Sequence, residues 1–121
     1  MKKKILVIDD DDLVRKSIES ILRIEGYESV CVNNPLEALD KIKETNFDLI
    51  VSDIRMPGMN GVEAARTIRK MINEGAKRQM PIIFITGYAE TSVELDVEKL
   101  GEVIIKPFDV TRLAMTIREY L

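Results

Sequence analysis

The residues best suited to chemistry follow short apolar runs. They are Asp9, Asp10, Asp53, Thr86 and Lys106. Carboxylates that lie close together repel one another unless a cation sits among them, and Mg²⁺ suits an all-oxygen site that also receives phosphate. One carboxylate could then act as a nucleophile and form an acyl phosphate. Phosphoryl transfer asks the protein mainly for positioning and charge stabilisation, which a metal, a lysine and a threonine can supply.

Histidine is absent, and the chain of 121 residues has one cysteine and a net charge of -3. The lack of histidine removes Ser-His-Asp triads, histidine-based zinc sites and phosphohistidine chemistry within this chain. A single cysteine cannot form an internal disulfide, so the expected location is the cytoplasm. The acidic balance gives no support for nucleic-acid binding, and no run approaches the ~20 apolar residues that span a bilayer.

Short apolar segments with β-branched character alternate with amphipathic segments. The apolar segments are typical of strands buried on both faces of a parallel sheet, and they cover 5–8, 30–32, 49–51, 82–85 and 103–105. The stripes at helical spacing are Val14, Ile18, Ile21 and Leu22; Leu36, Leu39 and Ile42; Val62, Ala65, Ile68 and Ile72; and Leu113, Ile117 and Leu121. This alternation predicts one three-layer α/β domain with right-handed crossovers.

The expected helix boundaries agree with the alternation. Asn34 and Pro35 form an N-cap and a first-turn proline, and Gly26 stands where a helix should stop. Asp11 and Asp12 are expected to cap and charge the first turn of the helix that begins near residue 13, not to join the chemistry.

Ligands in an open parallel sheet bind at the carboxyl ends of the strands, beside the switch in strand order. The five chemical residues all follow, or end, the expected strands, so the fold would bring them to one edge. Taken singly, an aspartate run is commonly a solvated face and a lysine commonly a surface residue. Their coincidence at strand ends favours a site.

The sequence resembles the receiver domain of bacterial two-component response regulators. The resemblance covers essentially the whole chain and rests on LVIDDDD at 6–12, SDIRMPGMNG at 52–61, ITG at 85–87 and IIKPF at 104–108. It implies a flavodoxin-like (βα)5 doubly wound parallel sheet with strand order 2-1-3-4-5, formed by a single receiver domain over 1–121.

The same resemblance implies a metal site. Asp53 would be the phosphoacceptor and, with Asp10, would bind Mg²⁺ (or Mn²⁺) directly. Asp9 would act mostly through water, and the backbone carbonyl of Arg55 would be the third protein ligand.

A phosphate-binding set is implied beside it. Lys106 would pair with the phosphoryl oxygens, or with Asp53 before transfer, and Thr86 would turn toward the phosphoryl group. Gly87 would leave room for that group and offer a backbone N–H. The bond between Lys106 and Pro107 is expected to be cis, a minority state even before proline.

The implied activity is a switch and not an enzyme. A phosphohistidine of a sensor histidine kinase or phosphotransfer domain would donate to Asp53, the output face would change, and the acyl phosphate would slowly hydrolyse. The effector domain or output protein is not identified, and this domain is expected to bind neither nucleic acid nor membrane directly. Val103 stands where the family usually has an aromatic residue coupled to Thr86, so either the switch is blunter or Tyr88 takes part of that role.

Two other functions compete with this one. Asp9 and Asp11 have the D-x-D spacing of haloacid-dehalogenase-like phosphohydrolases, with Asp9 as nucleophile, but that interpretation leaves Asp53 unexplained. A pseudo-receiver would use the same fold as a docking module that needs no phosphorylation. The intact set of Asp10, Asp53, Thr86 and Lys106 argues against docking alone.

Overall fold

The computed structural model describes residues 2–53, 66–67, 69–70, 73–74, 80–86, 102–105 and 110–121. For Pro35, Thr86, Glu102, Val103, Ile105 and Val110, the description is of the backbone. The strands are β1 (Lys4–Ile8), β2 (Glu28–Val32), β3 (Leu49–Asp53), β4 (Ile82–Thr86) and β5 (Glu102–Ile105). The helices with defined bounds are α1 (Asp12–Ile24), α2 (Pro35–Glu44) and α5 (Val110–Tyr120). Residues 66–67, 69–70 and 73–74 also have helical backbone.

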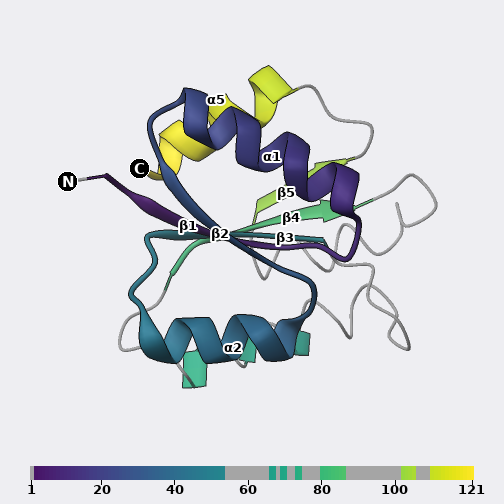
Figure 1. Cartoon of the computed structure of the whole chain (residues 1–121), viewed down its shortest axis with the longest axis vertical. Coiled ribbons are helices and arrows are strands. Elements are labelled where there is room, and N and C mark those ends of the chain that lie inside the picture. Colours follow the sequence, from purple (N-terminus) through teal and green to yellow (C-terminus); the bar gives the residue numbers. More distant parts are fainter. Residues whose placement is uncertain are drawn as a thin grey trace.

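All five strands lie in one parallel sheet with the order β2-β1-β3-β4-β5 (Figure 1). This confirms the predicted strand order. The register places Ile8 of β1 opposite Ser52 of β3. Asp9 and Asp53 are the next residues along their chains, so they lie side by side where β1 and β3 reach the carboxyl edge of the sheet.

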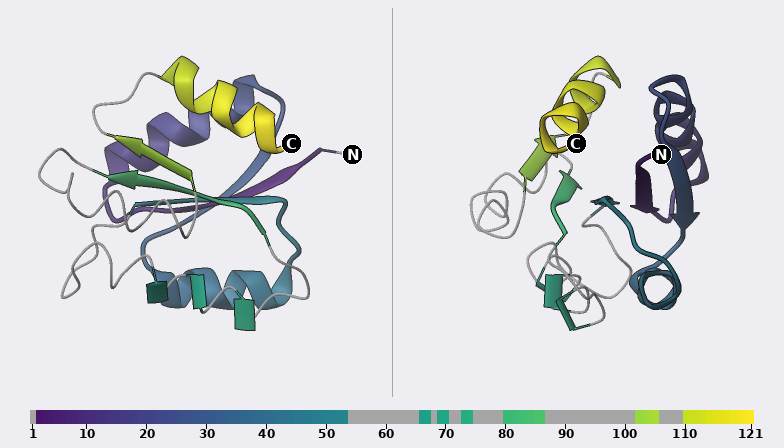
Figure 2. Two further views of the ribbon diagram at one scale, coloured as in Figure 1. Left: turned by 180° about the vertical axis from the view of Figure 1, so that it is seen from behind. Right: turned by 90° about the vertical axis from the view of Figure 1, so that its left-hand side faces the viewer.

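Helices cover both faces of the sheet, with α2 on one side and α1 and α5 on the other (Figures 1 and 2). Successive β1 residues alternate between the two cores: Leu6 and Ile8 pack toward α2, whereas Ile5 and Val7 pack toward α1 and α5. The core on the α2 side is Leu6, Ile8, Val32, Ala38, Ile42, Phe47, Ile50, Met80, Ile82 and Phe84. The other core is Ile5, Val7, Ile18, Leu22, Leu49, Val51, Ile83, Ile85, Ile104, Leu113 and Ile117. Two buried faces explain why the strand sequences are apolar without alternation.

The predicted helix boundaries near 26 and 34 are confirmed. Gly26 has φ 87° in the turn after α1, a conformation that costs other residues free energy because of their Cβ atoms. The Asn34 side chain accepts a hydrogen bond from the N–H of Glu37 at 3.0 Å, which caps α2.

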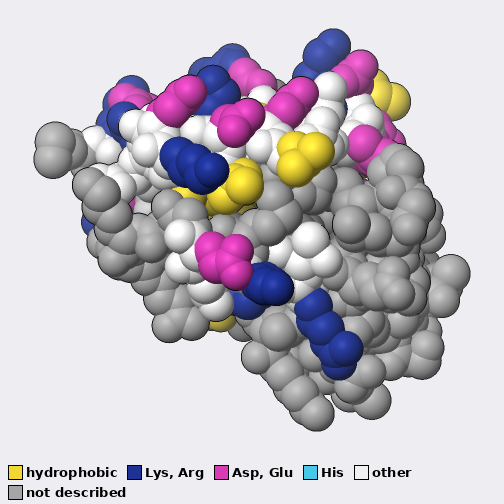
Figure 3. Space-filling view, turned by 90° about the horizontal axis from the view of Figure 1, so that it is seen from below, with side chains coloured by type: hydrophobic (Ala, Val, Ile, Leu, Met, Phe, Trp, Pro, Cys, Tyr) yellow, Lys and Arg dark blue, Asp and Glu magenta, His cyan; other side chains and the backbone are white. Residues whose placement is uncertain are grey.

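The surface seen in Figure 3 carries a mixture of charges. Acidic and basic side chains of the described residues intermingle there, and hydrophobic side chains are scattered among them. The described part of this face therefore offers no patch of a single sign. No described helix is both long and apolar enough to cross a bilayer.

The prediction that Leu36 lies on the buried stripe of its helix is wrong. Leu36 is 72 % exposed, whereas Ala38 and Ile42 on the same helix are buried. Ala38 and Ile42 are four residues apart and share a helix face, but Leu36 and Ala38 differ by two residues, which turns their side chains by roughly 200°. The proposed stripe of Val62, Ala65, Ile68 and Ile72 lies outside the described residues.

These exposures predict opposite outcomes for two leucine-sized truncations on α2. Ile42→Ala removes a side chain that is 6 % exposed and should lower the free energy of unfolding by about 2–5 kcal/mol. Leu36→Ala should change it by no more than about 0.5 kcal/mol. Urea unfolding followed by circular dichroism measures both, and similar losses for the two variants would contradict the assigned face of α2.

Candidate functional site

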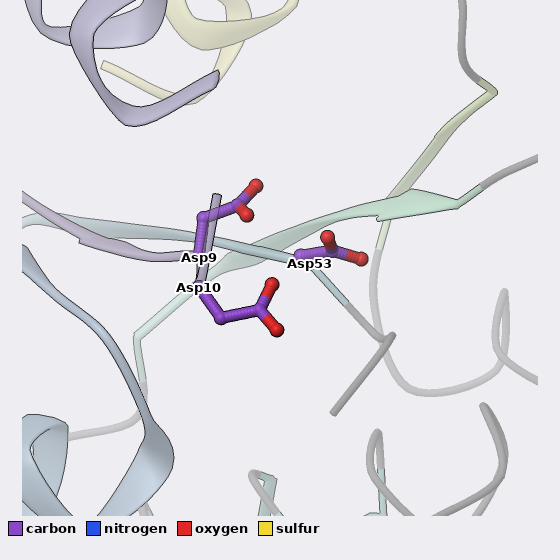
Figure 4. Close-up of side chains that lie close together, drawn as sticks. All are labelled: Asp9, Asp10 and Asp53. Carbon is purple, nitrogen blue, oxygen red and sulfur yellow. The ribbon is translucent and has the colours of Figure 1, made fainter. Parts of the chain in front are cut away.

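Three carboxylates meet at the carboxyl edge of the sheet. Asp9 and Asp10 follow β1, and Asp53 ends β3; the close-up in Figure 4 shows the three side chains together. Each contributes one oxygen to a group in which the oxygens lie within 4.8 Å of one another. Asp9 and Asp53 are 1 % and 3 % exposed, whereas Asp10 is exposed to solvent. Two carboxylates of the cluster are thus buried, and the third is accessible to solvent.

Asp9 is held by several hydrogen bonds. Its backbone N–H donates to the carbonyl of Val32 at 3.1 Å, which ties it to the end of β2. Its Oδ1 accepts from the N–H of Asp11 at 2.9 Å, and its backbone carbonyl accepts from Arg15 Nη1 at 2.8 Å. The backbone and side chain of Asp9 therefore have a defined orientation.

The electrostatics of the cluster call for a cation. Two carboxylates at this separation repel each other by about 3 kcal/mol at an effective dielectric constant of about 20. The donor set consists of carboxylate oxygens, the ligands that hard divalent cations such as Mg²⁺ and Mn²⁺ prefer. The cluster fits such an ion by its chemistry, with Asp9, Asp10 and Asp53 as the residues that would hold it.

Asp11 and Asp12 serve the helix, as the sequence predicts. The Asp11 carboxylate accepts from the N–H groups of Leu13 and Val14 at 2.9 and 3.3 Å, so it is the N-cap of α1. The side chain of Asp12 is 74 % exposed in the first turn and pairs with Arg15. Since Asp11 is engaged as a cap, the D-x-D interpretation loses its second catalytic carboxylate.

The remaining predicted site residues are only partly described. Thr86 ends β4, where its backbone pairs with Ile105 of β5, and Val103 pairs with Phe84. The expectations for Arg55, Gly87, Tyr88, Lys106 and Pro107 lie outside the described residues.

Arg15 is a residue beside the site that the sequence did not single out. It lies in the first turns of α1, and long side chains on a helix lean back toward its N-terminus. That lean carries its guanidinium over the loop that holds Asp9 and Asp10. A long cationic side chain three to four residues after a helix start is the signal that could have indicated it.

Cys31 is not part of the site. It lies half-buried in β2, with Sγ 3.9 Å from Glu19 Oε2. Burial, followed by the charge of Glu19, raises the pKa of the thiol from its ordinary 9.0 to about 11. The thiol is therefore protonated at neutral pH and is a poor nucleophile.

Comparisons with known proteins agree with the fold described above. The family model described as "Response regulator receiver domain" matches residues 5–118. Regulatory protein AtoC of Escherichia coli is 32 % identical over 98 % of this chain, but the match covers 25 % of AtoC. The chain thus spans about a quarter of that relative's length.

Other relatives have a similar length to this chain. Sporulation initiation phosphotransferase F of Bacillus subtilis is 31 % identical over 100 % of this chain and 95 % of its own. Among solved structures, a CheY-like response regulator receiver domain protein from Methanospirillum hungatei is 32 % identical, with a TM-score of 0.80 over 98 % of this chain and 93 % of that one.

The cluster predicts a metal response that separates Asp10 from Asp12. Mg²⁺ at 100 times its dissociation constant should stabilise the wild-type chain by about 2.7 kcal/mol. Asp10→Asn should lose most of that gain and, because one repelling charge is gone, should be more stable than wild type without metal. Asp12→Asn should keep the gain, because the amide oxygen can still accept from Arg15. Thermal unfolding with and without Mg²⁺ measures this, and equal losses from both variants would contradict the division of the aspartates.

The raised pKa of Cys31 predicts slow alkylation. At pH 8 a pKa of about 11, in place of 9.0, lowers the thiolate fraction about 100-fold. Iodoacetamide should therefore react far more slowly with the folded chain than with the chain in urea. Because the folded chain holds this proton more tightly than the unfolded chain, the same group should lower stability as the pH rises from 9.0 toward 11. Equal alkylation rates in the two states would exclude the shift.

Proposed function

The chain belongs to the response regulator receiver domain family of two-component systems, and from that membership we propose that it is a phosphorylation switch with Asp53 as the phosphoacceptor. Receiver domains are phosphorylated by histidine kinases and linked to output functions. The observation that carries the proposal is the cluster of Asp9, Asp10 and Asp53, whose oxygens lie within 4.8 Å of one another at the sheet edge.

The proposed step is a phosphoryl transfer to a carboxylate. An Asp53 oxygen attacks the phosphorus of a phosphohistidine on a partner protein, the P–N bond breaks, and the imidazole takes up a proton as it leaves. The product is an acyl phosphate, which water later hydrolyses. A divalent cation held by the cluster would supply charge stabilisation for the phosphoryl oxygens. Asp53 is 3 % exposed at the end of β3, so the backbone of a buried strand fixes its position.

Four further roles rest on the sequence pattern. Lys106 would pair with the phosphoryl oxygens, Thr86 would turn toward them, and the backbone of Gly87 would donate to them. The backbone carbonyl of Arg55 would complete the metal ligands. The strand order supports the role proposed for Thr86. Thr86 ends β4, and β4 lies beside β3, which ends at Asp53.

The other functions fit the cluster less well. A phosphohydrolase that used Asp9 as nucleophile would leave Asp53 without a role and would need Asp11, which caps α1. A docking module that needs no phosphorylation would gain nothing from three repelling carboxylates. The proposed activity is therefore that of a switch and not of an enzyme with turnover.

The proposal also covers the partners of the chain and its domain organisation. The donor would be a sensor histidine kinase or a phosphotransfer domain, and the output would pass to an effector domain or a separate protein. Residues 1–121 would act as a single receiver domain. The net charge of -3 gives no electrostatic case for direct nucleic-acid binding. The cytoplasmic location suggested by the single cysteine remains a prediction.

The test is phosphorylation by a small donor. Incubation with acetyl phosphate and Mg²⁺ should add one phosphoryl group to the intact protein, as measured by mass spectrometry, and chelation of Mg²⁺ should prevent it. Asp53→Asn should abolish the added mass, whereas Asp40→Asn, at an exposed position of α2, should leave it unchanged.

Two results would contradict the proposal. An unchanged mass in the wild-type chain would exclude the acyl phosphate. Steady release of phosphate that survives Asp53→Asn and is lost in Asp9→Asn would instead establish a phosphohydrolase.

A further inference from the structure

Arg15 joins three segments around the acidic cluster. Its Nη1 donates to the backbone carbonyl of Asp9 at 2.8 Å and to Asn33 Oδ1 at 2.6 Å, and its Nη2 pairs with the carboxylate of Asp12. Asp9 follows β1, Asn33 follows β2, and Asp12 begins α1. One guanidinium therefore connects the loops that follow β1 and β2 with the start of α1.

The carbonyl that Arg15 holds belongs to the peptide bond between Asp9 and Asp10. On the other side of Asp9, its N–H donates to the carbonyl of Val32. A peptide bond is planar, so fixing its carbonyl also fixes the direction of the next N–Cα bond. Arg15 thus helps to fix the position of the Asp10 Cα atom, from which the exposed side chain of Asp10 departs.

The acceptor on the second loop is itself held in place. The backbone N–H of Asn33 donates to Glu37 Oε2 at 3.2 Å, and the next residue, Asn34, caps α2. Arg15 therefore ties the loop of Asp9 and Asp10 to the start of another helix. A mobile surface side chain would give no such anchor.

An ordinary helix ion pair does not account for this arrangement. Exposed pairs three or four residues apart contribute little and need no burial. Arg23, on the same helix, forms such a pair. Its Nη2 lies 3.0 Å from Glu19 Oε1, and its side chain is 74 % exposed. The side chain of Arg15 is 18 % exposed, and two of its three partners are outside the helix.

We propose that Arg15 is a positioning residue for the divalent cation site, one that holds the peptide between Asp9 and Asp10 so that the Asp10 carboxylate faces Asp9 and Asp53. The inference rests on the proposed function, because it assigns Arg15 a role toward the cation of that site. Groups that orient metal ligands typically change metal affinity about 10–100-fold when they are lost.

The charge of Arg15 and its positioning role predict opposite changes in cation affinity when Arg15 is replaced. Removing a positive charge near three carboxylates should, by Coulomb's law alone, tighten cation binding. Removing the group that orients Asp10 should weaken it. The sign of the change in affinity therefore separates the two effects.

The experiment compares Arg15→Gln with Arg23→Gln, which removes the same charge from the far end of α1. Mn²⁺ affinity is measured from the electron paramagnetic resonance signal of the free ion. Arg15→Gln should weaken binding about tenfold, and Arg23→Gln should leave it unchanged. Thermal unfolding without metal checks that both variants are folded.

Two further variants keep the inference testable if Arg15→Gln folds poorly. Arg15→Lys keeps the charge but lacks the planar fork that reaches two acceptors, so it should weaken Mn²⁺ binding despite the retained charge. Asn33→Ala keeps Arg15 and removes one of its anchors, so it should weaken binding in the same direction. Amide spectra of the metal-free variants should show shifts at Asp9 and Asp10.

The outcomes distinguish this inference from the proposed function. If the wild-type chain binds Mn²⁺ through Asp10 and folded Arg15 variants bind it equally or more tightly, the positioning role is wrong and the switch stands. If the wild-type chain binds no more Mn²⁺ than Asp10→Asn does, the metal site fails and the positioning role fails with it.

Discussion

The repulsion among three carboxylates held within 4.8 Å of one another is the constraint on which the site depends. Burying even one ionised carboxylate costs several kcal/mol unless charge or hydrogen bonds offset the loss of water. Asp9 and Asp53 nevertheless sit at the ends of two adjacent strands in the middle of the sheet. The free energy that keeps them there comes from the two apolar cores, which fix the backbone of β1 and β3 from both faces. A divalent cation at this site would be held by Asp9 and Asp53, whose backbones the sheet keeps from moving apart, together with the exposed Asp10.

The four consecutive aspartates avoid a fourfold repulsion because the chain changes structure within them. Asp9 and Asp10 follow β1, whereas Asp11 caps α1 and Asp12 enters its first turn. Arg15 lies between the two pairs, with one nitrogen on the Asp9 carbonyl and the other on Asp12. Two of the four like charges thus belong to the acidic cluster with Asp53, and the other two belong to the start of α1.

Much of the fold and the core of the site followed from the sequence because both depend on local patterns. Continuous apolar runs predict strands covered on both faces, and parallel strands end at a common edge, so the convergence of Asp9, Asp10 and Asp53 could be expected. Leu36 and Arg15 could not be placed in this way. The way in which α2 crosses the sheet decides which side of the helix is buried. Ala38, four residues before Ile42, competes with Leu36 for that side, and the sequence alone does not decide between them. The partners of Arg15 come from a neighbouring loop, and hydrogen bonds between segments leave no local pattern.

The register of β1 against β3 links the core to the chemistry. Ile8 lies opposite Ser52, so Asp9 lies beside Asp53; a slip of one residue would separate the carboxylates. The same slip would exchange the two faces of the moving strand, because successive side chains point to opposite sides. Leu6 and Ile8 would then face α1 and α5, and Ile5 and Val7 would face α2, against cores packed for the reverse arrangement. The apolar residues of β1 therefore help to specify the site, although their side chains lie in the two cores. The two cores thus fix the ends of β1 and β3, and the hydrogen bonds of Asp9 with Val32, Asp11 and Arg15 then orient the loop that carries Asp9 and Asp10.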